Sequence, residues 1–186
     1  MIYSWKNIVK HSLPLLTVCI FIEIFAGQIL QGKQEMLVLF PVFLVSIPVI
    51  NGIGGNIGSV LGARLASGLH VGYITIDIKD KEMHDNLLTS ILMGFITYFV
   101  LAIVIYFIAL FGGIQMGIGL IEFVFVVLGT GVLLICVISL VSVFTAFWSF
   151  KKGLDPDDMV APVVTTVGDT LGIVFLFLMI GVVGIW

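Results

Sequence analysis

The sequence predicts an all-α integral membrane protein with five transmembrane helices. Hydrophobic residues make up 60% of the 186-residue chain, charged residues only 10%, and the mean hydropathy is +1.27. A soluble domain carries roughly 25% charged residues, so this chain lacks the polar side chains needed to cover a water-exposed surface. Its apolar runs are long and continuous, which favours helices over the short alternating strands of a membrane barrel. We expect residues 1–186 to form a single transmembrane domain without a soluble regulatory domain.

Five apolar segments have the length, roughly 17 to 25 residues or more, that a helix needs to cross a bilayer. They are residues 13–30, 37–69, 87–111, 120–150 and 160–186. The third and fourth are identified by their length and hydropathy, and short polar loops separate all five.

The basic residues predict the orientation. If the N-terminus is cytoplasmic, seven of the eight Lys and Arg residues lie on the cytoplasmic side, and only Lys33 lies outside. This asymmetry follows the positive-inside rule. Five spans then place the C-terminus, Trp186, outside. A net charge of -3 is too small to indicate a nucleic-acid partner, and we expect a multi-pass protein of the cell membrane.

The first span, 13–30, contains an acid about ten residues from its start, Glu23. A carboxyl group near the middle of a membrane is costly and is usually functional. Glu23 and Gly27 share one helix face at i, i+4 spacing. Two interpretations stay open for Glu23, a role in an ion path or proton linkage and a buried structural contact.

The second span, 37–69, is too long for one straight crossing. As a helix it measures roughly 48 Å, against a hydrocarbon core of about 30 Å. It must tilt, extend into the cytoplasm or break, and the expected place of a break is Pro48–Asn51–Gly52, where proline removes a backbone hydrogen bond and glycine loosens the turn. Freed backbone groups at membrane depth are tolerated inside protein or facing a water-filled cavity, so this helix is expected to border one of these.

Small residues recur along the same span at intervals of three and four: Gly52, Gly55, Ser59, Gly62 and Ala66. This stripe predicts close helix packing. Packing alone does not explain the two asparagines at membrane depth, Asn51 and Asn56. We therefore assign Asn51, Gly55 and Asn56 to a candidate ion path.

The last span, 160–186, contains Asp169 about nine residues, or roughly 14 Å, from its start. An acid near the membrane centre costs at least roughly 2.5–3.5 kcal/mol on insertion scales. Pro162, Thr165, Asp169 and Gly172 share one stripe of the helix. The favoured interpretation is a pore or ion site, and the alternative is a structural hydrogen bond to a neighbouring helix. Before this span, Asp155-Pro156 predicts a helix start.

Two segments resemble the MgtE-type magnesium channels. Pro48-x-x-Asn51-Gly52-x-Gly54-Gly55-Asn56-x-Gly58 is similar to their glycine-rich second helix. Asp155-Pro156 followed by Ala161-Pro162-x-x-Thr165-Thr166-x-x-Asp169-x-x-Gly172 is similar to their fifth helix. Five spans with an inside N-terminus agree with that family, which is related to the eukaryotic magnesium solute carriers.

The resemblance implies a homodimer with a pore along the subunit interface. It further implies that Asp169 lines the pore and holds a hydrated Mg2+, with assistance from backbone oxygens one turn earlier, at Thr165. We assign Thr166 to the same candidate metal site. Mg2+ usually keeps several waters and takes one or two carboxylates, so a symmetric pair of Asp169 side chains suits it. Asn56 is expected to hold the hydration shell by hydrogen bonds. Mg2+ is thus the transported ion, other divalent cations being possible, and no nucleic acid is expected as a partner.

Two further classes of function stay open beside a Mg2+ channel. One is a Na+-coupled Mg2+ exchanger in which Glu23 takes part, and the other is a non-transporting structural membrane subunit. An enzyme is not expected, because the sequence shows no paired acid and base, Ser-His arrangement or metal-ligand motif on a shared helix face. No residue is therefore assigned a catalytic role.

Overall fold

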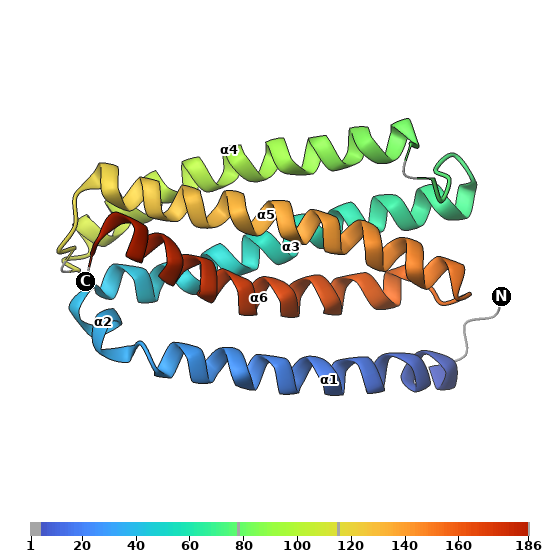
Figure 1. The fold of residues 1–186 in the computed structure, drawn as a ribbon, viewed down its shortest axis with the longest axis horizontal. Coiled ribbons are helices and arrows are strands. Elements are labelled where there is room, and N and C mark those ends of the chain that lie inside the picture. The colour runs from blue at the N-terminus through green and yellow to red at the C-terminus, as the bar shows by residue number, and fades with distance from the viewer. Residues whose placement is uncertain (1–4, 78, 115, 186) are drawn as a thin grey trace.

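The computed structural model of the chain describes residues 5–77, 79–114 and 116–185, and these residues form six helices without a strand (Figure 1). The helices are α1 (Trp5–Gln31), α2 (Gln34–Leu39), α3 (Pro41–Val71), α4 (Lys81–Phe111), α5 (Leu120–Lys151) and α6 (Pro156–Val183). All except α2 are long and apolar enough to cross a membrane, which gives five candidate spans. The predicted fold class is confirmed.

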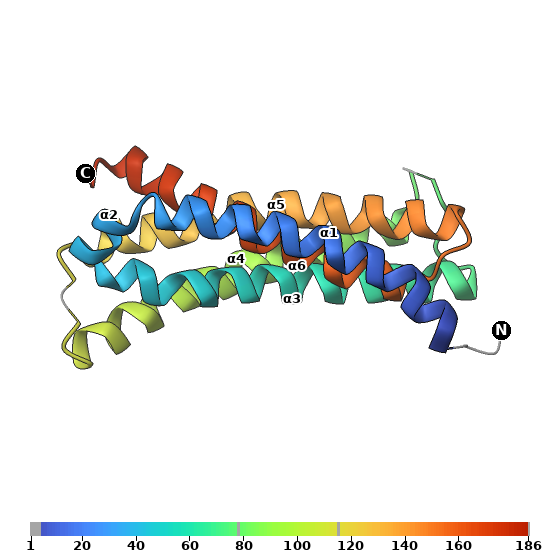
Figure 2. The ribbon, with the colours of Figure 1, turned by 90° about the horizontal axis from the view of Figure 1, so that it is seen from below.

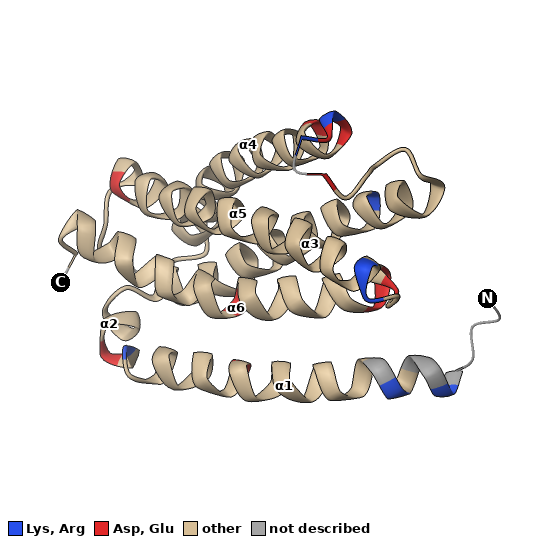
Figure 3. Ribbon diagram, turned by 45° about the vertical axis from the view of Figure 1, so that its right-hand side comes forward, with Lys and Arg blue, Asp and Glu red and all other residues tan. Residues whose placement is uncertain are grey.

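The five long helices lie side by side, and their connections alternate between the two ends of the bundle (Figure 1). The start of α1 shares one end with the α3–α4 and α5–α6 connections, and the end of α6 lies at the other. Lys and Arg gather at the first of these ends, which we call the basic end (Figure 3). The clustering agrees with the charge asymmetry of the sequence, while the inside position of this end stays a prediction. Trp186, the predicted outer terminus, is outside the described residues.

Helix α6 lies inside the bundle, with α1, α3 and α5 packed around it. Helix α1 runs along α6 at the edge (Figures 1 and 2). Only 11% of the most apolar stretch of α1 is buried, against 44% for α3, α5 and α6. In a bilayer, α1 therefore has mostly lipid or a partner molecule as its surroundings.

The predicted break at Pro48–Asn51–Gly52 is wrong, because α3 is continuous through these residues. The interruption lies earlier, at Phe40, which separates α2 from α3 with φ -127° and ψ 72°. Pro41 follows it at the first turn of α3. A residue before proline is driven out of the helical region, and proline is well tolerated at a helix start. Pro48, by contrast, lies inside α3 and is exposed, and the helix continues past it.

The small-residue stripe of α3 packs closely along most of its length, although not at Gly52. A Cβ at Gly62 would overlap Val160 of α6 and lie 3.3 Å from Oγ of Ser142 of α5, and one at Gly55 would lie 3.1 Å from Cγ2 of Thr165 of α6. Gly52 has no atom within 4 Å of a Cβ position, so the prediction was wrong there. Close packing is concentrated on the side of α3 that faces α5 and α6.

The predicted start of the last span is confirmed. Asp155 is the N-cap of α6, and its side chain accepts a hydrogen bond of 3.0 Å from the Asp157 amide. Pro156 occupies the first turn, where its missing N–H removes no helical bond. The cap fixes where α6 begins and so sets the depth at which its polar residues lie.

Candidate functional site

The backbones of α3 and α6 come close together at the level of Asp169. The side-chain amide Nδ2 of Asn51 donates a hydrogen bond of 3.1 Å to the main-chain oxygen of Asp169. A Cβ at Gly55 would lie 3.1 Å from Cγ2 of Thr165, and one at Gly168 would lie 3.2 Å from Cδ1 of Ile138. Glycine at both positions therefore leaves room for this close helix contact.

Asp169 lies halfway along the 28 residues of α6, far from both ends of the bundle. Its side chain is partly exposed on the protein surface. The carboxylate of Glu23, from α1, accepts a hydrogen bond from Thr166, three residues before Asp169 on α6. Two acidic groups from different helices therefore lie in the same region, near the middle of the candidate spans, an arrangement that favours a bound cation or proton.

Helix α1 meets α6 in a parallel register that two contacts define. The Thr166 hydroxyl donates a hydrogen bond of 3.0 Å to Oε1 of Glu23. One turn earlier, the Cys19 thiol contacts the main-chain oxygen of Pro162 at 3.8 Å. Both pairs are separated by 143 residues in sequence, so the two parallel helices keep the same register over this turn. Glu23 thus has a defined hydrogen-bond partner within the subunit.

Thr165 and Thr166 point in different directions. Thr165 is exposed beside Gly55, and its hydroxyl donates back to its own helix, to the oxygens of Ala161 at 2.9 Å and Pro162 at 3.1 Å. Thr166 is buried toward α1, where it binds Glu23. The open side of α6 therefore presents Thr165 and Asp169, and Thr166 links this helix to α1.

Asn56 lies on a different face of α3 from Asn51. Its side chain is exposed and lines a small pocket of about 110 Å³ together with Ser90 and Met93 of α4. Within one subunit, the structure brings Asn51 and Gly55 to Asp169 and leaves Asn56 apart from them. An ion-path role for Asn56 therefore stays a prediction.

The sequence analysis did not identify two contributors to this region. One is the hydrogen bond between Thr166 and Glu23, because nothing in a single sequence shows which helices are neighbours. The other is Gly168, whose spacing of four residues from Gly172 forms a small-xxx-small pattern typical of close helix contacts. This spacing is the sequence feature from which Gly168 could have been predicted.

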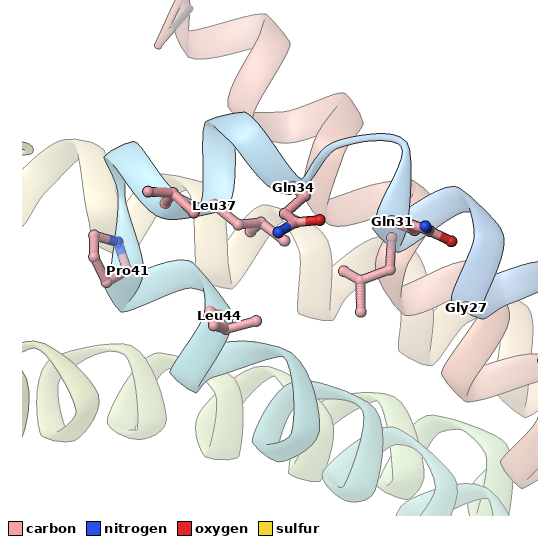
Figure 4. A pocket seen from close by; sticks show the side chains of 8 residues that line it. Gly27, Gln31, Gln34, Leu37, Pro41 and Leu44 are labelled. Carbon is pink, nitrogen blue, oxygen red and sulfur yellow. The ribbon is translucent and has the colours of Figure 1, made fainter.

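A larger pocket of about 560 Å³ lies between α1, α2 and the start of α3 (Figure 4). Its lining is mainly apolar, with Gln31 and Gln34 contributing amide groups. It starts at Gly27, one turn beyond Glu23, and continues away from the basic end.

Among the residues that the structure describes, no three His, Cys, Asp or Glu side chains gather into a group that could hold a metal ion. A cation at Asp169 would therefore depend on few protein ligands and on its own water.

Comparison with known proteins matches most of the chain to a protein family. The model of the MgtE family, described as divalent cation transporter, matches residues 47–179. This range includes α4 and α5 and most of α3 and α6, with Asn51, Gly55 and Asp169 among its residues. No curated protein and no solved structure matches the chain. The match covers well over half of the sequence, and the five apolar helices are those of a multi-pass membrane protein. The chain belongs to the MgtE family of divalent cation transporters.

Proposed function

We propose that this protein carries Mg2+ across the cell membrane through a pore at a homodimer interface, with Asp169 of each subunit holding the hydrated ion. The observation that carries the proposal is the partly exposed carboxylate of Asp169 halfway along a membrane-spanning helix. An acid at this depth needs a cation, a proton or a buried partner. An Asp169 pair at a dimer axis would supply two carboxylates to one ion.

The surroundings of Asp169 suit a hydrated ion better than a stripped one. Thr165 is the neighbouring polar residue on the open side, and its hydroxyl already donates to main-chain oxygens. The hydroxyl oxygen keeps capacity to accept hydrogen bonds from water. Mg2+ dehydrates reluctantly and usually keeps several waters. Asp169 then neutralises part of the charge of the ion while Thr165 contacts its hydration shell. Asn56, on another face of α3, is proposed to contact the hydration shell from elsewhere in the pore.

The same site supports a second candidate, a Na+-coupled Mg2+ exchanger. The specific observation is the interaction between Glu23 and Asp169 within one subunit. Their mutual repulsion favours uptake of a second positive charge, either Na+ or a proton, when the divalent cation leaves. In this alternative Glu23 belongs to the transport cycle, and flux depends on an opposing ion gradient.

The test is Mg2+ flux into liposomes that contain the purified protein, wild type beside Asp169→Asn, with and without a Na+ gradient. The asparagine variant keeps the shape of the side chain and removes its charge. We expect its saturable flux to fall at least about tenfold, the effect of losing 1.4 kcal/mol of interaction. Wild-type flux in this variant would refute the role of Asp169.

The Na+ gradient separates the candidates. Flux that is indifferent to Na+ supports a channel, and flux that requires Na+ and is lost in Glu23→Gln supports the exchanger. An absence of Mg2+ flux under every gradient would refute Mg2+ transport and leave transport of another divalent cation or a non-transporting membrane subunit as the interpretations.

A further inference from the structure

The contact between α3 and α6 contains a buried amide that is only half satisfied. Asn51 is 6% exposed. Its Nδ2 donates to the Asp169 main-chain oxygen at 3.1 Å, while its Oδ1 is buried with no hydrogen-bond partner among the described residues. A buried polar atom without a partner destabilises a fold. Helix packing alone would be served by a small apolar side chain, as at Ala66 on the same helix, so the amide calls for another explanation.

Helix α6 is shaped to receive this amide. A Cβ at Gly172 would overlap Oδ1 of Asn51. A Cβ at Gly168 would lie 3.2 Å from Cδ1 of Ile138 and at ordinary van der Waals distance, 3.8 Å, from the main-chain oxygen of Asn51. Glycines therefore stand one residue before and three residues after Asp169, and the amide of Asn51 is held against the helix turn that bears the carboxylate.

We propose that Asn51 is a positioning residue for the cation site, acting through the main-chain carbonyl of Asp169. The hydrogen bond attaches α3 to α6 at the residue that carries the carboxylate. It therefore fixes the height and rotation of this turn relative to α3, and with them the position of the carboxylate. Groups that bind an ion need placement within about 0.5 Å to work well. This inference rests on the proposed ion-binding role of Asp169.

The inference predicts a change in cation affinity rather than in capacity. In Asn51→Ala and in Asn51→Leu, which is closer in volume, we expect the Mg2+ concentration for half-maximal flux to rise about 3- to 10-fold, in line with loss of one hydrogen bond. Maximal flux should stay within about twofold of wild type. Thermal unfolding of each variant is measured beside the flux. A fall in unfolding temperature and flux with unchanged half-saturation in both variants would show a purely structural role and overturn the inference.

The same measurements distinguish failure of the proposed function from failure of this inference. If Asp169→Asn transports like wild type, the ion site is wrong and Asn51 has nothing to position. If Asp169→Asn abolishes flux while both Asn51 variants keep the wild-type half-saturation, the positioning role alone is refuted.

A double-mutant cycle tests the geometry directly. Gly172→Ala should displace the Asn51 amide and raise the half-saturation concentration, and adding Asn51→Ala should remove the collision. We expect the double variant to match Asn51→Ala alone in half-saturation and in unfolding temperature. The control is Gly62→Ala, which strains the same helix pair against Val160 away from the amide. Asn51→Ala should not rescue it. Additive penalties of Asn51→Ala and Gly172→Ala in both measurements would overturn the inference.

Discussion

Outside the α3–α6 contact, the closest packing against a glycine is that of the Tyr98 ring of α4 against Gly131 of α5. Tyr98 of α4 is fully buried, and its hydroxyl donates a hydrogen bond of 2.8 Å to the main-chain oxygen of Ile50. This bond is made one residue before Asn51, on the helix that carries the candidate ion path. Gly131 of α5 leaves room for the tyrosine ring. The pair therefore stabilises α3 where it supports the site.

Replacing Gly131 with alanine should destabilise the protein. The new Cβ would overlap the Tyr98 ring, which must move and lose its bond to Ile50. Overpacking of this kind costs about 1–3 kcal/mol, and we expect a lower thermal unfolding temperature in detergent. The control is Gly27→Ala, whose Cβ would have no neighbour within 4 Å and whose helix propensity improves. Equal unfolding temperatures for the two variants would contradict the packing argument.

At the scale of elements, α1 is the helix with the least buried surface, and its polar contacts to α6 are few. The Thr166–Glu23 hydrogen bond at 3.0 Å is the central one. In lipid, where helices gain little from hydrophobic association, packing and interhelical hydrogen bonds hold them together. The docking of α1 is therefore expected to depend on this bond.

Removing the hydroxyl in Thr166→Val should loosen α1. The carboxylate of Glu23 then loses its hydroxyl donor, at a cost of about 1–3 kcal/mol. Cys19 is 7% exposed at the same helix contact, so its thiol reports on separation of the helices. We expect its rate of alkylation by a small maleimide to rise at least about fivefold, since 1 kcal/mol corresponds to this factor.

Thr17→Val is the matched control for this prediction. Thr17 is exposed on α1, and its hydroxyl bonds at 2.8 Å to the Leu13 oxygen of its own helix. Its removal should leave the reactivity of Cys19 unchanged. If both variants react alike, the hydrogen bond to Glu23 does not hold α1 in place. Measurement in a Cys136→Ala background avoids labelling of the exposed second thiol.

At the scale of the whole molecule, the proposed function depends on the open side of α6. Thr165 is exposed and Asp169 partly exposed on a helix that is otherwise enclosed by α1, α3 and α5. In a protein of the MgtE family, a surface that bears a mid-membrane carboxylate suits an interface between subunits better than contact with lipid.

The proposed dimer predicts cross-linking at this surface. Thr165→Cys, in a background that lacks Cys19 and Cys136, should form a disulfide-linked dimer in membranes under mild oxidation. Phe144 is 71% exposed on α5, and Phe144→Cys should stay monomeric under the same conditions. Cross-linking at position 144 and none at 165 would place the interface elsewhere. Electrophoresis without reducing agent provides the measurement.

The orientation predicts which loops an impermeant thiol reagent reaches. In intact cells, Glu35→Cys at the end opposite the basic end should be labelled from outside. Lys152→Cys, in the α5–α6 connection at the basic end, should be labelled only after the membrane is opened. Both residues are exposed on the protein, so accessibility depends on the membrane alone. The reverse pattern would show that the positive-inside rule fails for this chain.

Sequence reasoning predicted the spans and the start of α6 well because both are local properties. A run of apolar residues forms a membrane helix whatever its neighbours are, and Asp155 with Pro156 caps α6 through contacts within one turn. The break at Pro48 was wrong for the opposite reason. A proline inside a helix leaves one carbonyl without its usual donor, and the sequence cannot tell whether the surrounding bundle tolerates this. Phe40 and Pro41 mark the true interruption.

The sequence by itself determined that this protein is a bundle of membrane-spanning helices with Glu23, Asn51, Asn56 and Asp169 at membrane depth, because hydropathy and helical spacing act over short distances. Only the tertiary structure decided which of them meet. It joins Asn51 to Asp169 and Glu23 to Thr166, and it places Asn56 beside Ser90. These pairings depend on how helices rotate and pack, which joins segments 118 residues apart at Asn51 and Asp169 and 143 residues apart at Glu23 and Thr166. At Asn51, a glycine of the other helix, Gly172, makes room for the contact.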